Sequence, residues 1–315
     1  MVKLSGSQAI GAGFRVIGKH PFAPLIWGLV FVVLVLGVQL AGYAAVWPDL
    51  TAAFRTASDH PPSDHSMLSQ NAAMSRIQML MLPYQLLQIP LTLFSVALVD
   101  AAILRAVLEP RNSGSAYLRL GAQELWMMVV SLAACALLVM FTVAVIVAAV
   151  VIGFGVRAAL HTESNPMVAV VLVLGIIALF LWLAARFSMA FPMTFADRQF
   201  RLFESWALTR GHTWKIIGVM LTMFLIVLMI ELAIAIVVLG VMFAVAGGSH
   251  AGAMTRWAQQ PPQVLIGQMA PFMIGGLLLY SAIVGVIHTI TIAPFADLYR
   301  QLTAERPGPA DFGGA

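Results

Sequence analysis

The feature that most constrains the fold of this chain is a set of six apolar stretches, each long enough to cross a lipid bilayer. A helix crosses a hydrocarbon core about 30 Å thick with about 20 apolar residues. Inside lipid the backbone N–H and C=O groups must be paired, and a helix pairs them within one segment. We therefore predict an all-α, polytopic membrane protein whose six transmembrane helices cover residues 22–46, 77–104, 124–156, 167–195, 216–246 and 264–296.

Composition indicates that no soluble domain accompanies these spans. Charged residues make up 10% of the chain and hydrophobic residues 61%, whereas about 25% of the residues are charged in an ordinary soluble domain. The polar segments between the spans are too short to bury an independent core. We expect one integral membrane domain over residues 1–306 and, because of its Pro and Gly content, a disordered tail over residues 307–315.

The distribution of basic residues predicts the orientation of the spans. With the amino terminus in the cytoplasm, thirteen Lys and Arg residues lie on the cytoplasmic side and four lie on the other side. Cytoplasmic loops of membrane proteins are enriched in Lys and Arg. We therefore expect a multi-pass protein of the bacterial inner membrane with both termini cytoplasmic. No basic run resembles a DNA- or RNA-binding element, so we expect no nucleic-acid partner.

The ends of the even-numbered spans indicate internal repetition. Asp100, Asp197 and Asp297 lie at the cytoplasmic ends of these spans, and an arginine follows each within five residues. A serine six residues before a glycine also precedes each odd-numbered span, in the pairs Ser5 and Gly11, Ser115 and Gly121, and Ser205 and Gly211. Each unit is then an amphipathic surface helix followed by a transmembrane hairpin. We predict three such repeats, over residues 1–105, 106–202 and 203–306.

A family resemblance rests on the segment that follows the fourth span. Residues 186–192 are Arg-Phe-Ser-Met-Ala-Phe-Pro and residues 204–211 are Glu-Ser-Trp-Ala-Leu-Thr-Arg-Gly, with Trp214 soon after. This pattern resembles the membrane domain of the glycerophosphoryl diester phosphodiesterase family and its stand-alone bacterial relatives. The sequence contains neither the phosphodiesterase barrel of that family nor its paired acidic metal ligands. The resemblance therefore implies a membrane module without that activity, and we expect no catalytic residues, metal or cofactor.

Polar side chains inside the spans are the first site candidates, because such groups are costly in hydrocarbon and usually face a bundle interior or a cavity. Pro83 and Pro90 flank a polar break in the second span, where they disturb the helical ladder and free carbonyl acceptors. We predict an intramembrane polar site formed by Tyr84, Gln85, Gln88, Glu231 and His288. A single histidine on an apolar helix is also typical of a hydrogen-bonded packing residue.

Charged residues where the spans meet the cytoplasm are the second group of candidates. Asp197 with Arg201 at i+4, and Asp297 with Arg300 at i+3, have the spacing of ion pairs on one helix face. The corresponding pair in the second span points about 140° apart and needs partners elsewhere. We predict a charged floor that serves structural pairing, or else a headgroup or gating site, formed by Asp100, Arg105, Arg186, Asp197, Arg198, Arg201, Arg210, Asp297 and Arg300.

These observations favour a small set of functions. Amphipathic surface helices and an arginine-rich floor, in a chain without a catalytic motif, favour a non-catalytic module. Such a module associates with membrane lipids through their anionic headgroups, or scaffolds a protein partner. The alternative is a transporter or lipid-translocating protein with a polar site around Glu231. An ion channel requires a continuous polar pore, of which the spans show little, and an intramembrane enzyme requires titratable groups within reach of one another.

Overall fold

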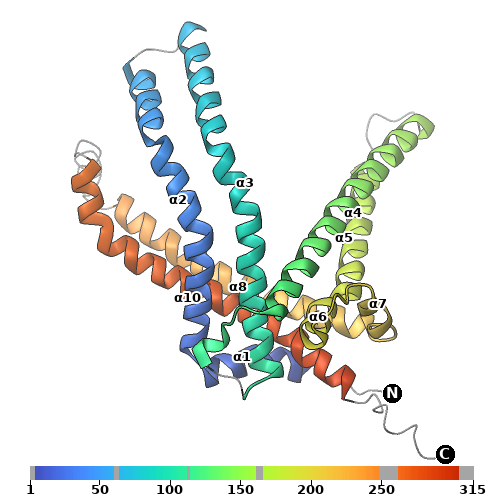
Figure 1. The fold of residues 1–315 in the computed structure, drawn as a ribbon. Helices are drawn as coiled ribbons and strands as arrows, with labels where there is room; N and C mark the ends of the chain where they lie inside the picture. Colours follow the sequence, from blue (N-terminus) through green and yellow to red (C-terminus); the bar gives the residue numbers. More distant parts are fainter. Residues whose placement is uncertain (1–3, 60–63, 112–113, 161–165, 248–261, 305–315) are drawn as a thin grey trace, which may run out of the picture.

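The computed structural model describes residues 4–59, 64–111, 114–160, 166–247 and 262–304. Within these ranges the chain forms helices and no strand (Figure 1). The long helices are α2 (Phe22–Asp59), α3 (Asp64–Leu108), α4 (Ala122–Leu160), α5 (Pro166–Phe187), α8 (Thr213–Gly247) and α10 (Pro262–Thr303). The short elements are α1 (Gly6–Lys19), the 3₁₀ turn η1 (Gly114–Tyr117), α6 (Ala190–Asp197) and α7 (Glu204–Leu208).

Six helical segments are long and apolar enough to cross a membrane, which confirms the predicted all-α, polytopic membrane class. They cover Phe22–Ala52, Asn71–Leu108, Ala122–Gly155, Val170–Asp197, Thr213–Val241 and Ile274–Thr303. Helix α3 continues past Asp100, and α10 continues past Asp297. These two carboxylates therefore avoid the last helical turn, where the helix dipole would oppose their charge. The predicted tail, residues 307–315, lies outside the described residues.

The fourth span differs from the continuous helix that residues 167–195 predict. Helix α5 ends at Phe187, and α6 begins at Ala190. Proline lacks a backbone N–H, and its ring clashes with the carbonyl four residues earlier. For Pro192 this carbonyl belongs to Ser188, one of the two residues that separate the helices. The proline accounts for the position of the break, and the span is composed of two helices.

Helix α1 is amphipathic, as the sequence predicts for a surface helix. Ser5 caps its first turn, because the serine hydroxyl accepts a hydrogen bond from the N–H of Gln8. One face of the helix packs against α10 and α8. The spacing of three to four residues places the buried residues on that face, and these are Ala9, Ala12, Gly13 and Val16.

Glycines let α1, α2 and α10 approach one another closely. A Cβ atom on Gly28 of α2 would lie 1.7 Å from the carbonyl oxygen of Ser281 in α10. A Cβ atom on Gly285 would lie equally close, 1.7 Å, to the carbonyl oxygen of Pro24. On Gly13 of α1 it would lie 2.8 Å from the backbone of α10. Small residues allow such backbone contact between membrane helices, so these three helices form a closely packed group.

The buried core lies at one end of the molecule. Helices α1, α6 and α7 lie there, together with the adjoining ends of the long helices (Figure 1). We call this packed end the floor. Its largest buried side chains include Trp27 of α2, Arg105 of α3, Tyr117 of η1 and Phe195 of α6. The floor therefore joins residues from all parts of the described chain.

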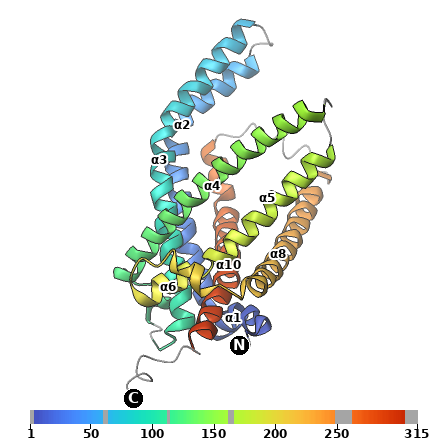
Figure 2. The ribbon, with the colours of Figure 1, turned by 90° about the vertical axis from the view of Figure 1, so that its right-hand side faces the viewer.

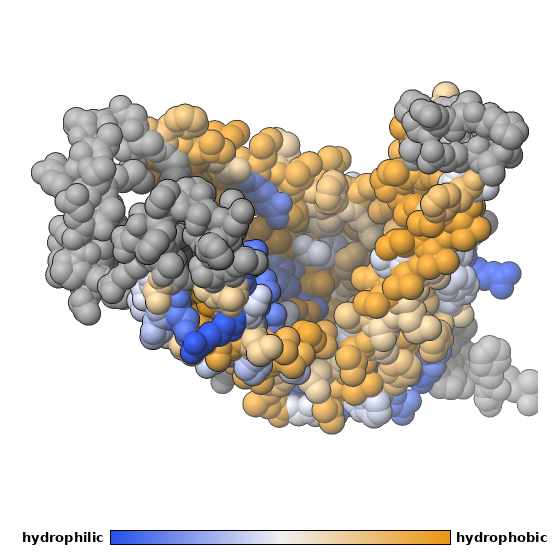
Figure 3. All heavy atoms as spheres, turned by 90° about the horizontal axis from the view of Figure 1, so that it is seen from above, coloured by the Kyte–Doolittle hydropathy of each residue, from blue (hydrophilic) through white to orange (hydrophobic). Residues whose placement is uncertain are grey.

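The halves of the long helices that lie away from the floor, here called the distal halves, diverge from one another. The α2–α3 hairpin, the α4–α5 hairpin and helices α8 and α10 lean apart (Figures 1 and 2). Large apolar side chains are exposed there, such as Met140, Val171 and Phe243. Seen from above, the molecule is hollowed between the hairpins, and hydrophilic residues lie deep in the hollow (Figure 3). Lipid hydrocarbon is the natural solvent for the apolar surfaces.

Candidate functional site

The residues of the predicted intramembrane polar site are divided among three helices, α3, α8 and α10. On α3, the ring of Tyr84 lies against Gly42 of α2, while Gln85 is exposed and Gln88 is half-buried. Glu231 is exposed on α8. Among the described residues, no hydrogen bond or ion pair joins these polar side chains to one another. Their grouping into one site stays a prediction.

His288, the fifth member of that predicted site, lies close to a residue of the predicted floor. Its Nδ1 atom is 3.5 Å from the Oδ1 atom of Asp100 on α3. The imidazole ring also packs against Phe31 of α2, with 5.4 Å between the ring centroids. Asp100 is 5% exposed, so the pair forms a polar contact inside the membrane-spanning region. It supplies the partner that Asp100 needs outside its own helix.

Arg105, at the end of α3, links four elements of the floor. Its guanidinium donates hydrogen bonds to the Tyr117 carbonyl at 2.5 Å, to the Gln123 side chain at 3.1 Å and to the Glu124 carboxylate. The ring of Phe195 in α6 lies 5.5 Å from the Arg105 Cζ atom. Arg105 is 2% exposed, and a buried cation is tolerated only with such complete pairing. Its role is therefore structural.

The turn η1 supplies backbone acceptors to this network. Ala116 and Tyr117 have φ angles of 52° and 63°, in the left-handed region that residues with a side chain rarely adopt. The Ala116 carbonyl accepts a hydrogen bond of 2.7 Å from the indole N–H of Trp27. The neighbouring Tyr117 carbonyl accepts the bond from Arg105. Two buried side chains thus hold the unfavourable backbone conformation in place.

Arg186 lies in the segment that carries the family resemblance. Its guanidinium lies against two tryptophan rings that also contact each other, with the Cζ atom 5.4 Å from the Trp182 centroid and 5.1 Å from the Trp206 centroid. It also donates a hydrogen bond of 3.4 Å to the Trp206 carbonyl. Each cation–π contact attracts the charge to the ring face. Arg186 therefore fixes α7 against the end of α5.

Ser205 gives the same segment a second structural link. Its buried hydroxyl donates to the Arg186 carbonyl at 2.7 Å and accepts from the Met189 N–H at 3.1 Å. The Thr209 hydroxyl donates to the Ser205 carbonyl at 2.9 Å. The two bonds of the Ser205 hydroxyl satisfy backbone groups that the break between α5 and α6 leaves without helical partners. The residues of the resemblance motif therefore have structural contacts in this fold.

The remaining predicted floor residues, at the end of α6 and in the segments on either side of α7, lie near the surface. Asp197 forms an ion pair with Arg201 at 3.2 Å, as their i+4 spacing predicts. Arg201 also lies 3.6 Å from the carboxylate of Glu204. Arg198 and Arg210 are exposed. Exposed pairs of this kind contribute little stability.

Asp297 of α10 is the centre of a cluster that joins α10 to α1. Its fully buried carboxylate lies 2.5 Å from the Arg300 Nη2 atom, the predicted i+3 pair, and 3.4 Å from the Arg15 Nη2 atom. The Gln301 amide donates to Asp297 at 2.8 Å, and its carbonyl accepts from the Ser5 N–H at 2.9 Å. A single carboxylate thus connects the first surface helix to the last span.

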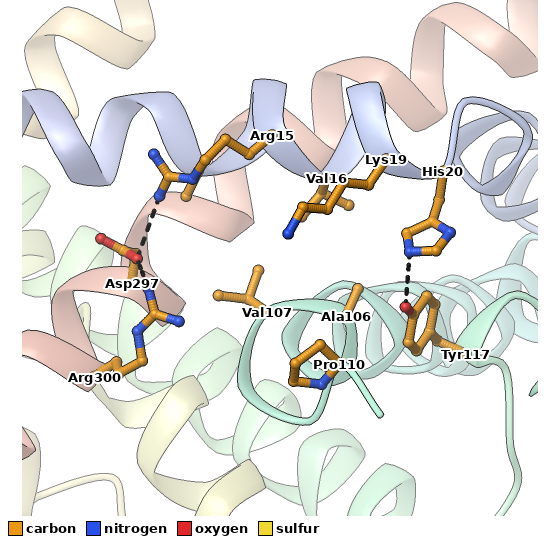
Figure 4. Close-up of a pocket in the computed structure, with 11 residues that line it drawn as sticks. Arg15, Val16, Lys19, His20, Ala106, Val107, Pro110, Tyr117, Asp297 and Arg300 are labelled. Carbon is orange, nitrogen blue, oxygen red and sulfur yellow. Dashed lines mark hydrogen bonds and ion pairs between the residues drawn. The ribbon is translucent and has the colours of Figure 1, made fainter. Parts of the chain in front are cut away.

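A pocket opens beside this cluster (Figure 4). It encloses about 520 Å³ of empty space, part of it open to solvent. We call it the floor pocket. Arg15 and Lys19 of α1 and Arg300 of α10 line it, and Val107 and Pro110 form an apolar wall. In Figure 4 the amino group of Lys19 extends from α1 into the gap between the helices. The pocket therefore combines cationic hydrogen-bond donors with an apolar surface.

The charges of the floor pocket favour an anion. Three cations and one carboxylate, that of Asp297, line the pocket, so with neutral histidine the pocket has an excess of two positive charges. Arg15 and Arg300 keep side-chain exposures of 47% and 53% although both contact Asp297. Lys19 is exposed and has no ion-pair partner among the described residues. Arginine and lysine N–H groups are the preferred donors to phosphate oxygens.

A hydrogen bond closes one side of the floor pocket. The Tyr117 hydroxyl and the His20 Nε2 atom are 3.0 Å apart, and their rings meet edge to face at 5.4 Å. Tyr117 is buried, so it fixes the imidazole at the end of α1. This contact gives the pocket a defined shape where α1 leads into α2.

Several of these residues are missing from the predicted sites. Arg15 and Lys19 are four residues apart on an amphipathic helix, and this spacing was a signal for a basic face beside the floor. Glu124, a single acid in the first turn of an apolar helix, was a signal for a buried partner of Arg105. The contact of His20 with Tyr117 joins positions 97 residues apart, and no pattern in the sequence indicates it.

Comparisons of the chain with protein-family models, with curated proteins and with solved structures found no match.

Proposed function

We propose that this protein is a non-catalytic integral membrane module that associates with lipids, and that the floor pocket binds the phosphate of an anionic headgroup. The observation that carries the proposal is the excess of positive charge from Arg15, Lys19 and Arg300 over Asp297 in an open pocket. Phosphate oxygens accept charge-assisted hydrogen bonds from these groups. The apolar wall at Val107 suits the glycerol and the start of the acyl chains.

The position of the pocket supports this ligand. It lies where amphipathic α1 meets the ends of the spans, the level at which headgroups lie. The predicted cytoplasmic side holds thirteen of the seventeen Lys and Arg residues, which supports an inner-membrane protein with a cytoplasmic floor. Anionic lipids attract basic segments at that surface. The proposed site therefore has its ligand at high local concentration.

The three-repeat organisation is part of the proposal. The short elements that precede the odd-numbered spans pack against the ends of even-numbered spans: η1 against α3, α7 against α5, and α1 against α10. The contact of α1 with α10 joins the first predicted repeat to the third, so the three repeats would form a closed ring. This arrangement supports the repeats proposed from the sequence. We also propose that the chain is related to the membrane domain of the glycerophosphoryl diester phosphodiesterase family. A lipid-associated module common to both would fit that relationship.

The test compares lipid binding by the purified protein and two lysine variants. Phosphatidylglycerol or phosphatidylcholine is titrated into detergent-solubilised protein, and bound lipid is counted by native mass spectrometry. Lys19→Gln removes a pocket cation without breaking an ion pair among the described residues. We expect it to weaken phosphatidylglycerol binding about tenfold, the effect of losing about 1.4 kcal/mol.

Lys215→Gln is the matched control, because Lys215 is exposed at the floor end of α8 and does not line the floor pocket. It should bind phosphatidylglycerol as the wild type does. Equal losses in both variants would mean that binding depends on total charge. Unchanged binding by Lys19→Gln, or equal affinity for phosphatidylcholine, would refute the headgroup site.

A transporter or lipid-translocating protein is the second candidate, and the hollow between the hairpins favours it (Figure 3). Glu231 is the residue that this candidate uses. The lipids retained after gentle extraction should then differ between the wild type and Glu231→Gln. A retained lipid that the variant loses would support a distal site. Bulk-like lipid together with a stoichiometric protein partner would instead support a scaffold.

A further inference from the structure

The contact between Asp100 and His288 lies outside the floor pocket and has no part in the proposed headgroup site. The two side chains come from α3 and α10, and both lie in membrane-spanning segments. The Oδ1 atom of Asp100, which is 3.5 Å from the His288 Nδ1 atom, is buried and has no hydrogen-bond partner. The Asp100 side chain is 7% exposed and that of His288 is 25% exposed. A buried carboxylate thus faces one partly accessible base.

No other charged group compensates this carboxylate within ion-pair distance in the described chain. Helix α2 contributes Phe31 to the site and has no charged residue between positions 22 and 48. The other titratable or charged groups near the floor are mostly paired with one another. The pairs are Arg15 and Arg300 with Asp297, Arg105 with Glu124, Arg201 with Asp197, and His20 with Tyr117. Four further groups lie elsewhere along their helices, namely Lys19, Lys215, Glu231 and Tyr280.

The charge of this pair depends on one proton. With one proton shared between the carboxyl and the imidazole, the pair has no net charge. Without that proton a carboxylate faces a neutral imidazole inside the membrane-spanning region, where an uncompensated charge is costly. Histidine exchanges protons in the physiological range more readily than other side chains do. We propose that Asp100 and His288 form a proton-binding site that strengthens the contact between α3 and α10 when it is protonated.

The location of the site gives this proton a structural consequence. Helix α3 belongs to the α2–α3 hairpin, whereas α10 lies outside it. The two helices cross near the floor (Figure 1). Loss of the proton would therefore weaken one of the contacts that hold α10 against the α2–α3 hairpin. This inference does not rest on the floor pocket, and its test leaves headgroup binding unchanged.

The test measures thermal unfolding of the full-length protein in nanodiscs between about pH 5 and pH 8, the range in which histidine titrates. The wild type should lose about 2–4 °C in unfolding temperature as the pH rises through the transition of the site. Asp100→Asn removes the carboxylate and should abolish this transition. Asp100→Glu keeps a carboxyl group and should retain it. Glu231→Gln, which removes an exposed intramembrane carboxyl group, should behave as the wild type.

A second measurement works without the asparagine variant if that variant does not fold. The ring nitrogen resonances of ¹⁵N-labelled His288, assigned by their loss in His288→Gln, should shift over the same pH range as the unfolding temperature. The same pH dependence in Asp100→Asn and in the wild type would overturn the proposal. So would His288 resonances that stay constant across the range.

Discussion

The floor and the distal halves of the same helices are held by different interactions. In the floor, the long helices contribute buried side chains, glycines bring α1, α2 and α10 together, and buried ion pairs join neighbouring elements. In the distal halves, α4 and α8 expose apolar side chains along most of their length. Lipid solvates an apolar helix as well as another helix does, so apolar surface alone gives little reason to associate. Specific contacts, rather than hydrophobicity, therefore determine where this bundle is closed.

A glycine substitution should show this difference most strongly. Gly28→Val places a side chain where a Cβ atom alone would lie 1.7 Å from a backbone oxygen. Backbone atoms cannot yield as side chains do, so we expect no folded protein by size-exclusion chromatography and circular dichroism. Gly175→Val in the distal half of α5 has open space around it and should fold. Equal tolerance of both changes would disprove the close crossing of α2 and α10.

The second prediction compares two arginines. Arg105→Met leaves the buried carboxylate of Glu124 without its cation, which should cost about 3–5 kcal/mol of stability. Arg76→Met removes an ion pair with Asp49 whose arginine is 73% exposed, and about 0–1 kcal/mol is expected. Chemical denaturation in detergent measures both.

A double variant tests the cause of the Arg105 effect. Arg105→Met combined with Glu124→Leu removes both buried charges, and should recover a large part of the lost stability. No recovery would show that packing around Phe195, rather than the unpaired charge, is responsible.

The third prediction compares two serines that both donate to a backbone carbonyl. Ser205→Ala removes bonds to the Arg186 carbonyl and from the Met189 N–H at the break in the fourth span. Buried groups without partners should cost about 1–3 kcal/mol. Ser75 donates to the Asn71 carbonyl on the exposed part of α3, where lipid headgroups or water can take the place of the lost hydrogen bond. Ser75→Ala should therefore change the unfolding midpoint much less, and a larger loss there than at Ser205 would contradict the comparison.

The sequence predicts the spans well because each is a local property of about 20 consecutive residues. It also predicts the pair of Asp297 with Arg300, since i+3 spacing places both on one helix face. It does not identify the partner of Arg105, because that partner, the Glu124 carboxylate, lies on the next long helix. The floor pocket likewise requires α1 to lie against α10 at the far end of the chain. Such contacts depend on how helices cross, and a hydropathy pattern has no information on crossing.

The break in the fourth span is an intermediate case. Pro192 is visible in the sequence, yet prolines at positions 48, 83 and 90 lie inside continuous helices. The difference lies in the partners of the freed backbone groups. At the break between α5 and α6 the Ser205 hydroxyl donates to the Arg186 carbonyl and accepts from the Met189 N–H. A proline therefore predicts a break only when another segment can satisfy the exposed backbone.

The smallest effect is expected at Glu231, the residue that the sequence made most prominent. It is exposed on α8 and, among the described residues, has neither hydrogen bond nor ion pair. Glu231→Gln should change stability by less than about 0.5 kcal/mol, as for a surface substitution, measured by denaturation in detergent. A loss comparable with that of Arg105→Met would mean that Glu231 has a buried partner. The distal halves would then close around it, and the difference between the floor and the distal halves would disappear.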